Sequence, residues 1–201
     1  MKKALALALT LALFACGETR VVDLNDPNQT TRMQNVMELE FRDWENVAQT
    51  MTTSMIASGA FTRIKDPVIA MGPMINDTAQ RFDTDILVRK IRATLVNSGK
   101  ARIATNFTGE DATSDAVRAQ RGNAEFDAGT IAAKGTLVAP NLSLSGKMLQ
   151  RTFQLQSGWF SSVDTRVEYY LQLALTDLRT GLSVWEGTKP IVKEGNRAPA
   201  W

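Results

Sequence analysis

The sequence predicts an α+β fold, with a largely antiparallel sheet and helices packed mainly on one of its faces. Three observations support this class. The last third of the chain contains three successive runs of strand composition that form a β-meander. Two earlier stretches carry apolar residues at helical spacing. A length of 201 residues is enough for one domain with a core of its own.

The chain opens with the features of a bacterial lipoprotein export signal. Lys2 and Lys3 precede an apolar run over residues 4–15, which is too short to span a bilayer as a permanent helix. The three residues before Cys16 are Leu, Phe and Ala, which matches the lipobox pattern. We therefore expect cleavage before Cys16 and lipidation of its thiol. Gly17 follows, where aspartate would favour inner-membrane retention, so the expected location is the periplasmic side of the outer membrane.

These features divide the chain into three parts. Residues 1–15 are the expected signal peptide, and residues 16–35 are the lipidated cysteine with a short polar tether that has no periodicity. Residues 36–201 form one predicted globular domain. Acyl methylenes contribute about 0.8 kcal/mol each when buried, so the lipid would hold the domain on a membrane leaflet.

Composition excludes several classes of function. The sequence has no histidine and one cysteine, so Ser-His-Asp and Cys-His catalysis, His or Cys metal sites and disulfides are excluded. Without Lys2 and Lys3 the chain has 21 basic and 21 acidic residues. This balance gives no excess of positive charge that would indicate binding to nucleic acid. We expect no enzyme activity, no catalytic residues, no metal and no cofactor.

Alternation and helical spacing place the first elements. Residues 37–41 alternate, which indicates a first strand or the end of the tether. Asp43 is a plausible N-cap for a helix that runs to about Ser58, with Gly59 at the C-terminal cap. An apolar run over residues 67–74 predicts a strand that ends at a turn, and Gly72-Pro73 within it indicates an edge strand or a bulge.

A βαβ unit follows from the next segments. Asp83 caps a second predicted helix through about Asn97, with Gly99 closing it. Residues 101–104 then give a strand, which would lie parallel to the preceding one. A weakly amphipathic helix is predicted over residues 110–126 and a loop over 129–140.

The C-terminal strands are predicted at residues 143–156, 166–177 and 182–192. In the middle strand, Val167, Tyr169, Leu171, Leu173 and Leu175 point one way, and Glu168, Tyr170, Gln172 and Thr176 point the other. This alternation predicts a sheet with one buried and one wetter face.

Several segments, taken in order, resemble the LpoB family of penicillin-binding-protein activators over about residues 65–193. The most specific stretch is Glu168 to Lys189, and shorter ones are Ile75 to Thr78, Asp83 to Asp85, Ile91 to Lys100 and Leu144 to Lys147. The resemblance implies an outer-membrane lipoprotein without a catalytic site that binds and activates a bifunctional class A penicillin-binding protein. It also implies a fold similar to the N-terminal domain of TolB. Family members in enterobacteria have a long Pro-rich tether, which this chain lacks.

Five residues are candidates for partner contact, and we expect a monomeric domain. Large aromatic and arginine side chains usually anchor protein interfaces. Trp159 and Phe160 lie in a polar turn beside Arg166, where the aromatics could anchor a partner or fold back over the sheet. Tyr170 projects to the wetter face, and Trp185 either shares a patch with it or contacts a covering helix.

Two alternative functions follow from the same sequence. Curli-secretion lipoproteins resemble the same fold, so the chain could be an envelope assembly or secretion lipoprotein with a TolB-like or curli-secretion-like domain. A carboxylate hydrolase would need an acid pair, for which Asp177 and Glu186 are the least implausible residues.

Overall fold

The structure is a computed structural model that describes residues 37–105, 111–156 and 163–195. Residues 36–201 form a compact unit of their own. The expected signal peptide, Cys16, the tether, Trp159 and Phe160 lie outside the described residues. The elements are α3 (Phe41–Ala57), η3 (Ala60–Arg63), β1 (Val68–Asp77), α4 (Thr84–Asn97), β2 (Arg102–Ile103), α5 (Ala112–Ala119), β3 (Leu142–Gln156), β4 (Val163–Asp177) and β5 (Leu182–Gly195).

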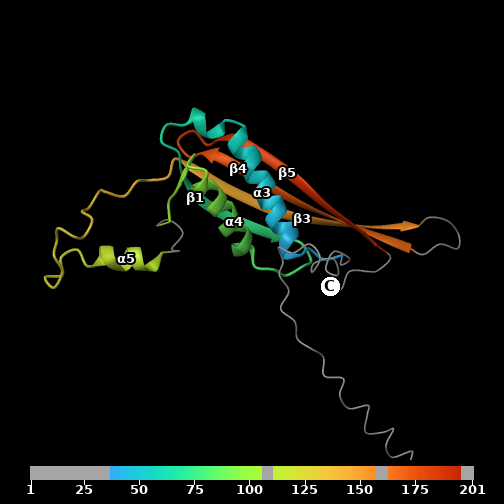
Figure 1. Ribbon diagram of the computed structural model, residues 1–201, viewed down its shortest axis with the longest axis horizontal. Coiled ribbons are helices and arrows are strands. Elements are labelled where there is room, and N and C mark those ends of the chain that lie inside the picture. Colours follow the sequence, from blue (N-terminus) through green and yellow to red (C-terminus); the bar gives the residue numbers. More distant parts are fainter. Residues whose placement is uncertain (1–36, 106–110, 157–162, 196–201) are drawn as a thin grey trace, which may run out of the picture. The chain divides into compact units, whose positions relative to one another are not determined.

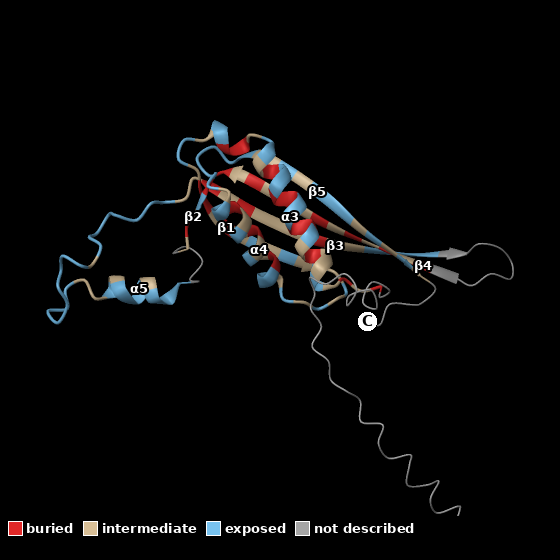
Figure 2. Cartoon of the chain, in the orientation of Figure 1, coloured by how far each residue is buried: buried red, intermediate tan, exposed pale blue. Residues whose placement is uncertain are grey.

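The five strands form one mixed sheet in the order β2-β1-β3-β4-β5 (Figure 1, with β2 labelled in Figure 2). β1 pairs in parallel with both β2 and β3, and β4 pairs in antiparallel fashion with β3 and β5. The predicted βαβ unit and C-terminal β-meander are confirmed. The prediction of a largely antiparallel sheet holds for β3, β4 and β5 but is wrong for β1 and β2. Both partners of β1 are reached through crossover connections rather than hairpins, and strands joined by a crossover pair in parallel.

Helix α4 begins and ends where its caps predicted. The Asp83 carboxylate accepts a hydrogen bond from the Asp85 backbone N–H at 2.9 Å, and Gly99 adopts a φ of +64° after the last turn. A left-handed conformation at this position costs glycine less than any other residue. Local cap chemistry therefore fixes both ends of the helix.

Helix α3 begins earlier than its pattern indicated. Its N-cap is Glu40, and Asp43 lies inside the first turn, where its carboxylate accepts a hydrogen bond from the Glu40 backbone N–H at 3.0 Å. The predicted strand at residues 37–41 does not form, since residues 37–40 are irregular and the helix starts at Phe41. Met37 and Leu39 are nevertheless buried, so the alternation reflected burial of an irregular lead-in segment.

Strand β1 is longer than predicted and extends through Asp77, beyond the expected turn. Its register shifts between Met71 and Met74, which confirms the bulge predicted from Gly72 and Pro73. The chain bends at residues 78–80, after the strand, where Thr78 donates hydrogen bonds from its backbone and its side chain to Asn76 Oδ1. The strand continues because its last residues pair with β3.

Helix α5 is shorter than the segment 110–126 indicated, since it ends at Ala119 and none of its residues is buried. Without a face packed on the core, the weak amphipathic pattern does not extend the helix. Residues 129–140 contain no helix or strand, as predicted.

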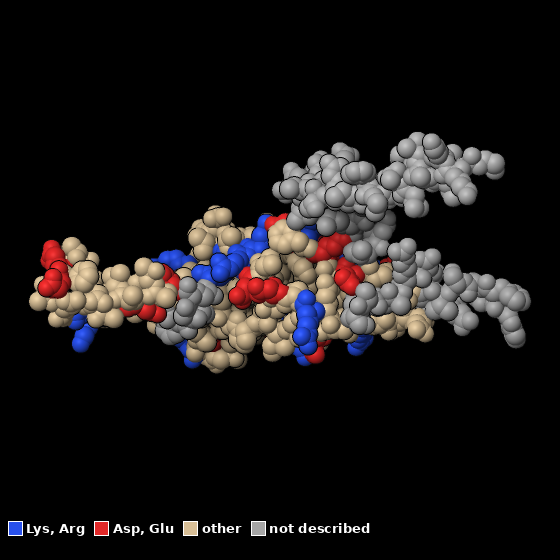
Figure 3. All heavy atoms as spheres, turned by 90° about the horizontal axis from the view of Figure 1, so that it is seen from below, with Lys and Arg blue, Asp and Glu red and all other residues tan. Residues whose placement is uncertain are grey.

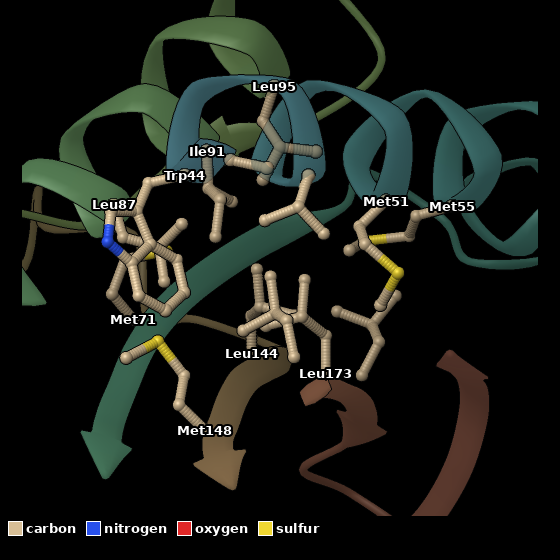
Figure 4. Close-up of a cluster of buried hydrophobic side chains, with 14 of the residues drawn as sticks. Trp44, Met51, Met55, Met71, Leu87, Ile91, Leu95, Leu144, Met148 and Leu173 are labelled. Carbon is tan, nitrogen blue, oxygen red and sulfur yellow. The ribbon is translucent and has the colours of Figure 1, made fainter. Parts of the chain in front are cut away.

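Helices α3 and α4 cover one face of the sheet (Figure 1) and bury it (Figure 2). Five alternate residues of β4 are at most 2% exposed: Val167, Tyr169, Leu171, Leu173 and Leu175. Against them lie Trp44, Met51 and Met55 from α3 and Leu87, Ile91 and Leu95 from α4 (Figure 4). The core therefore lies between two helices and one side of the sheet.

The lead-in segment 37–40 is fastened to this core by three side chains. Gln80 pairs with both backbone groups of Leu39, at 2.9 Å each. Tyr169 donates its hydroxyl hydrogen to the Met37 carbonyl at 3.2 Å, and Lys193 donates to the Glu38 carbonyl at 2.7 Å. The Lys193 ammonium also lies 2.6 Å from the Asp43 carboxylate. These contacts hold residues 37–40 on the helix-covered side of the sheet.

Adjacent residues of β4 should differ sharply in their effect on stability. Leu171→Ala removes a fully buried side chain, and we expect it to lower the free energy of unfolding by about 2–5 kcal/mol. Gln172→Ala is the matched control, because this side chain is on the opposite face, and its effect should be about 0.5 kcal/mol or less. Urea denaturation of both variants measures the difference, and equal losses would contradict the assignment of faces.

Candidate protein-binding face

The face of the sheet that α3 and α4 leave uncovered is called the open face here. Residues directly opposite one another on neighbouring strands share a face, so the strand register defines its members. Among them are Ile75 and Asp77 of β1, Ser145, Lys147, Leu149, Arg151 and Phe153 of β3, Arg166, Glu168, Tyr170, Gln172 and Ala174 of β4, and Glu186, Thr188, Pro190, Val192 and Glu194 of β5. Pro73, in the β1 bulge, lies beside Ile75 on the same side.

Two of the predicted contact residues, Arg166 and Tyr170, lie on the open face and belong to one polar network. The Arg166 guanidinium pairs with Glu194 and lies 3.9 Å from Glu168. The Tyr170 hydroxyl donates a hydrogen bond to the second oxygen of Glu168 at 2.5 Å. This bond raises the pKa of Tyr170 above its ordinary value of 10, because it stabilises the protonated hydroxyl beside a carboxylate.

The network holds the Tyr170 ring in one orientation. Arg151 lies directly opposite Glu168 on β3, so the two arginines and two glutamates balance in charge. In the view of Figure 3, basic and acidic side chains are interspersed over the surface. A preorganised aromatic ring within a locally neutral network is suited to contact with a protein, since little side-chain entropy remains to be lost on binding.

Trp185 lies on the other face, which corrects the hypothesis of a patch shared with Tyr170. It is directly opposite Leu175 of the core, and its ring packs beside Gly187 toward Met51 of α3. The alternative, contact with a covering helix, is what the structure shows. The cause is a bulge between Leu175 and Thr176, which shifts the register of β5 by one residue.

Sequence reasoning missed several apolar members of the open face. Phe153 is opposite Arg166 and is 41% exposed, and Val192 is 50% exposed. Leu149 and Pro190 lie on either side of Tyr170. The sequence of β3 does contain the pattern that identifies this face, because its odd-numbered residues alternate with the buried Leu142, Leu144 and Met148. Together these residues make an apolar surface around Tyr170.

A hollow of about 490 Å³ lies beside this surface and crosses β1, β3, β4 and β5. It is called the sheet hollow below. Short side chains at Ser145 and Ala174 give it depth, and longer ones surround them. Its remaining open-face lining consists of Pro73, Ile75, Lys147, Gln172, Glu186 and Thr188.

The acid pair considered for a hydrolase does not form. Asp177 lies on the helix-covered side of β4, where its carboxylate accepts a hydrogen bond from the Arg179 backbone N–H at 2.8 Å. Glu186 is opposite Ala174 on the open face. The two carboxylates are therefore separated by the sheet and cannot act on one substrate.

Two further properties concern the described residues. No group of three or more Cys, Asp or Glu side chains among them is placed to hold a metal ion. None of the helices in the described ranges is long and apolar enough to cross a membrane.

Two comparisons place the chain among known proteins. The family model of the peptidoglycan-synthase activator LpoB matches residues 43–191, from α3 to β5. The LpoB C-terminal domain from Salmonella enterica shares 17% identity at a TM-score of 0.45, over 74% of this chain and 98% of that one. The corresponding domain from Escherichia coli shares 14% identity at a TM-score of 0.42, with the same coverage. No curated protein matches the sequence.

The described domain is an α+β module with a mixed sheet, two covering helices and an open face that carries an ordered aromatic and polar surface. Its sequence matches one family model along nearly the whole of this module. The chain belongs to the LpoB family, which is described as a family of peptidoglycan-synthase activators. The resemblance noted from the sequence is thereby confirmed.

The buried turn at Asp177 should make stability depend on acidity. Hydrogen bonds from Arg179 lower the pKa of this carboxyl below its ordinary value of 3.8. A lowered pKa in the folded state stabilises the protein above about pH 4, and this contribution is lost as the pH falls through the folded pKa. We expect Asp177→Asn to be less stable than wild type at pH 6, with the gap narrowing below about pH 4. Thermal melting between pH 6 and pH 2.5 measures this, and a constant gap would contradict it.

Proposed function

We propose that this protein is a lipid-anchored envelope protein that binds and activates a bifunctional class A penicillin-binding protein. The observation that carries the proposal is the match to the LpoB family model over residues 43–191. An activator must bind one conformation of its partner more tightly than another, because differential affinity alone shifts an equilibrium. A rigid sheet face backed by a packed core is suited to that discrimination.

The proposed contact surface is the part of the open face around Tyr170. Tyr170 and Phe153 supply aromatic area, and Arg166 supplies a guanidinium held by two carboxylates. Such residues dominate binding energy when they are packed against a partner. Trp159 and Phe160 follow β3 in the chain, and we propose that they also contact the partner.

Anchoring of the domain is part of the same proposal. Cys16 is the proposed site of lipidation after removal of residues 1–15, and the outer membrane, facing the periplasm, is the proposed location. A tether of about 19 residues reaches at most about 65 Å. With this short reach, either the synthase extends outward toward the membrane, or the envelope is thinner, or the function differs. We further propose a monomer and a fold similar to the N-terminal domain of TolB.

Stimulation of a synthase tests the proposal directly. A soluble form that lacks residues 1–16 retains the compact unit 36–201. We expect it to accelerate lipid II polymerisation by one class A synthase from the same genome, with saturation at high concentration. Failure to bind or accelerate every such synthase would overturn the proposal and favour the assembly or secretion alternative.

Paired substitutions on the two sides of the domain locate the contact. Phe153→Ala removes an exposed ring from the open face, and we expect the concentration for half-maximal stimulation to rise about tenfold. Ile86→Ala is the matched control, because this exposed side chain belongs to α4 on the covered side. Titration of each variant into the polymerisation assay measures the shift. A larger effect of Ile86→Ala would contradict the proposed surface.

A further inference from the structure

The sheet hollow is built from two cross-strand rows of the open face. One row contains the longer side chains and forms a wall, and the other contains the short ones and forms the floor. The wall consists of Ile75, Lys147, Gln172 and Thr188, and the floor row of Ser145 and Ala174 ends at Glu186. The hollow is therefore open to solvent above and closed below by the sheet.

The floor is rigid because the core behind it is full. Gly146 lies between the two rows with its Cα directed toward the core, and a Cβ there would come within 2.6 Å of both Leu173 and Met74. Leu173 is 2% exposed. The hollow thus cannot collapse into the protein, and a ligand would meet a preformed surface.

The charge available in the hollow is negative. Lys147 is already paired with Asp77, with 2.8 Å between the ammonium nitrogen and the carboxylate oxygen. Glu186, in contrast, makes no hydrogen bond or ion pair to any residue that the structure describes. The side-chain amide of Gln172 is also without a partner within the described ranges. An occupant with a positive charge and hydrogen-bond donors would complement both groups.

Apolar groups line the opposite end of the hollow. Ile75 is 53% exposed, and Pro73 stands beside it on β1. The methyl group of Ala174 lies on the floor between them and Glu186. An aliphatic stem along this surface would place a cationic head at Glu186. Arginine combines such a stem with a planar head that binds carboxylate in bidentate fashion.

We propose that the sheet hollow receives an arginine side chain of the synthase, with its guanidinium on Glu186 and the Gln172 amide oxygen. This inference rests on the proposed function and adds to it the chemistry of the partner. Glu186 then has a role in recognition. Because Lys147 remains paired with Asp77, it does not repel the incoming cation as strongly as a free lysine would.

A small-molecule probe tests the hollow without the synthase. N-acetyl-arginine amide should shift the backbone amide resonances of Ala174, Glu186 and Gly187 in the soluble domain. The matched probe, N-acetyl-citrulline amide, has the same shape without the charge and should leave them unchanged. The Glu186→Gln variant should lose the response to arginine. No shift with the arginine probe, or equal shifts with both probes, would overturn the inference.

Affinity for the synthase provides the second measurement. We expect Glu186→Gln to weaken binding about tenfold, since a charge-assisted hydrogen bond is lost. Ala174→Leu, which fills the floor, should weaken it similarly while thermal melting shows an intact fold. Asp85→Asn is the matched control, because it removes an exposed carboxylate from α4 on the covered side, and its affinity should equal that of wild type.

The two measurements separate this inference from the proposed function. If the wild-type domain binds the synthase and both hollow variants bind equally well, the inference is overturned and the proposed function stands. If the domain binds no synthase but responds selectively to the arginine probe, the proposed function fails. The hollow is then an arginine site for another partner.

Discussion

Burial of five alternate side chains of β4 beneath α3 and α4 is the constraint on which the rest of the structure depends. Each of these residues is at most 2% exposed, and a shift of one residue would place polar side chains in the core. β4 also pairs along its whole length with β3, and with β5 over most of it. The alternation in one strand therefore sets which side of its neighbours is buried and which side remains available for binding.

The one-sided core gives the two faces of the sheet different surroundings. Tyr169 fastens the lead-in segment at Met37 on the covered side, while Tyr170 points from the next position to the open face. The core is packed between the two helices and the covered face of the sheet. The sequence of the open face can therefore vary without loss of the core.

Features set by local chemistry were predictable from the sequence, and features set by distant pairing were not. The caps of α4 and the alternation of β4 depend on residues close together in the chain, and both predictions are confirmed. The face of Trp185 depends on a bulge that forms where β5 meets β4, so residue parity within β5 could not decide between its two alternatives. The sheet hollow is lined by residues of four strands, so no single segment of the sequence predicts it.

Site-specific crosslinking tests most directly the central claim, that the open face contacts the synthase. Cys16 is the sole cysteine of the sequence, so a soluble form that lacks residues 1–16 can carry one new cysteine for a benzophenone label. Thr188→Cys places the label on the open face, and Arg89→Cys places it on α4. We expect irradiation with the synthase to crosslink the label at position 188 and to leave the label at position 89 unreacted. Crosslinking chiefly through position 89 would contradict the account.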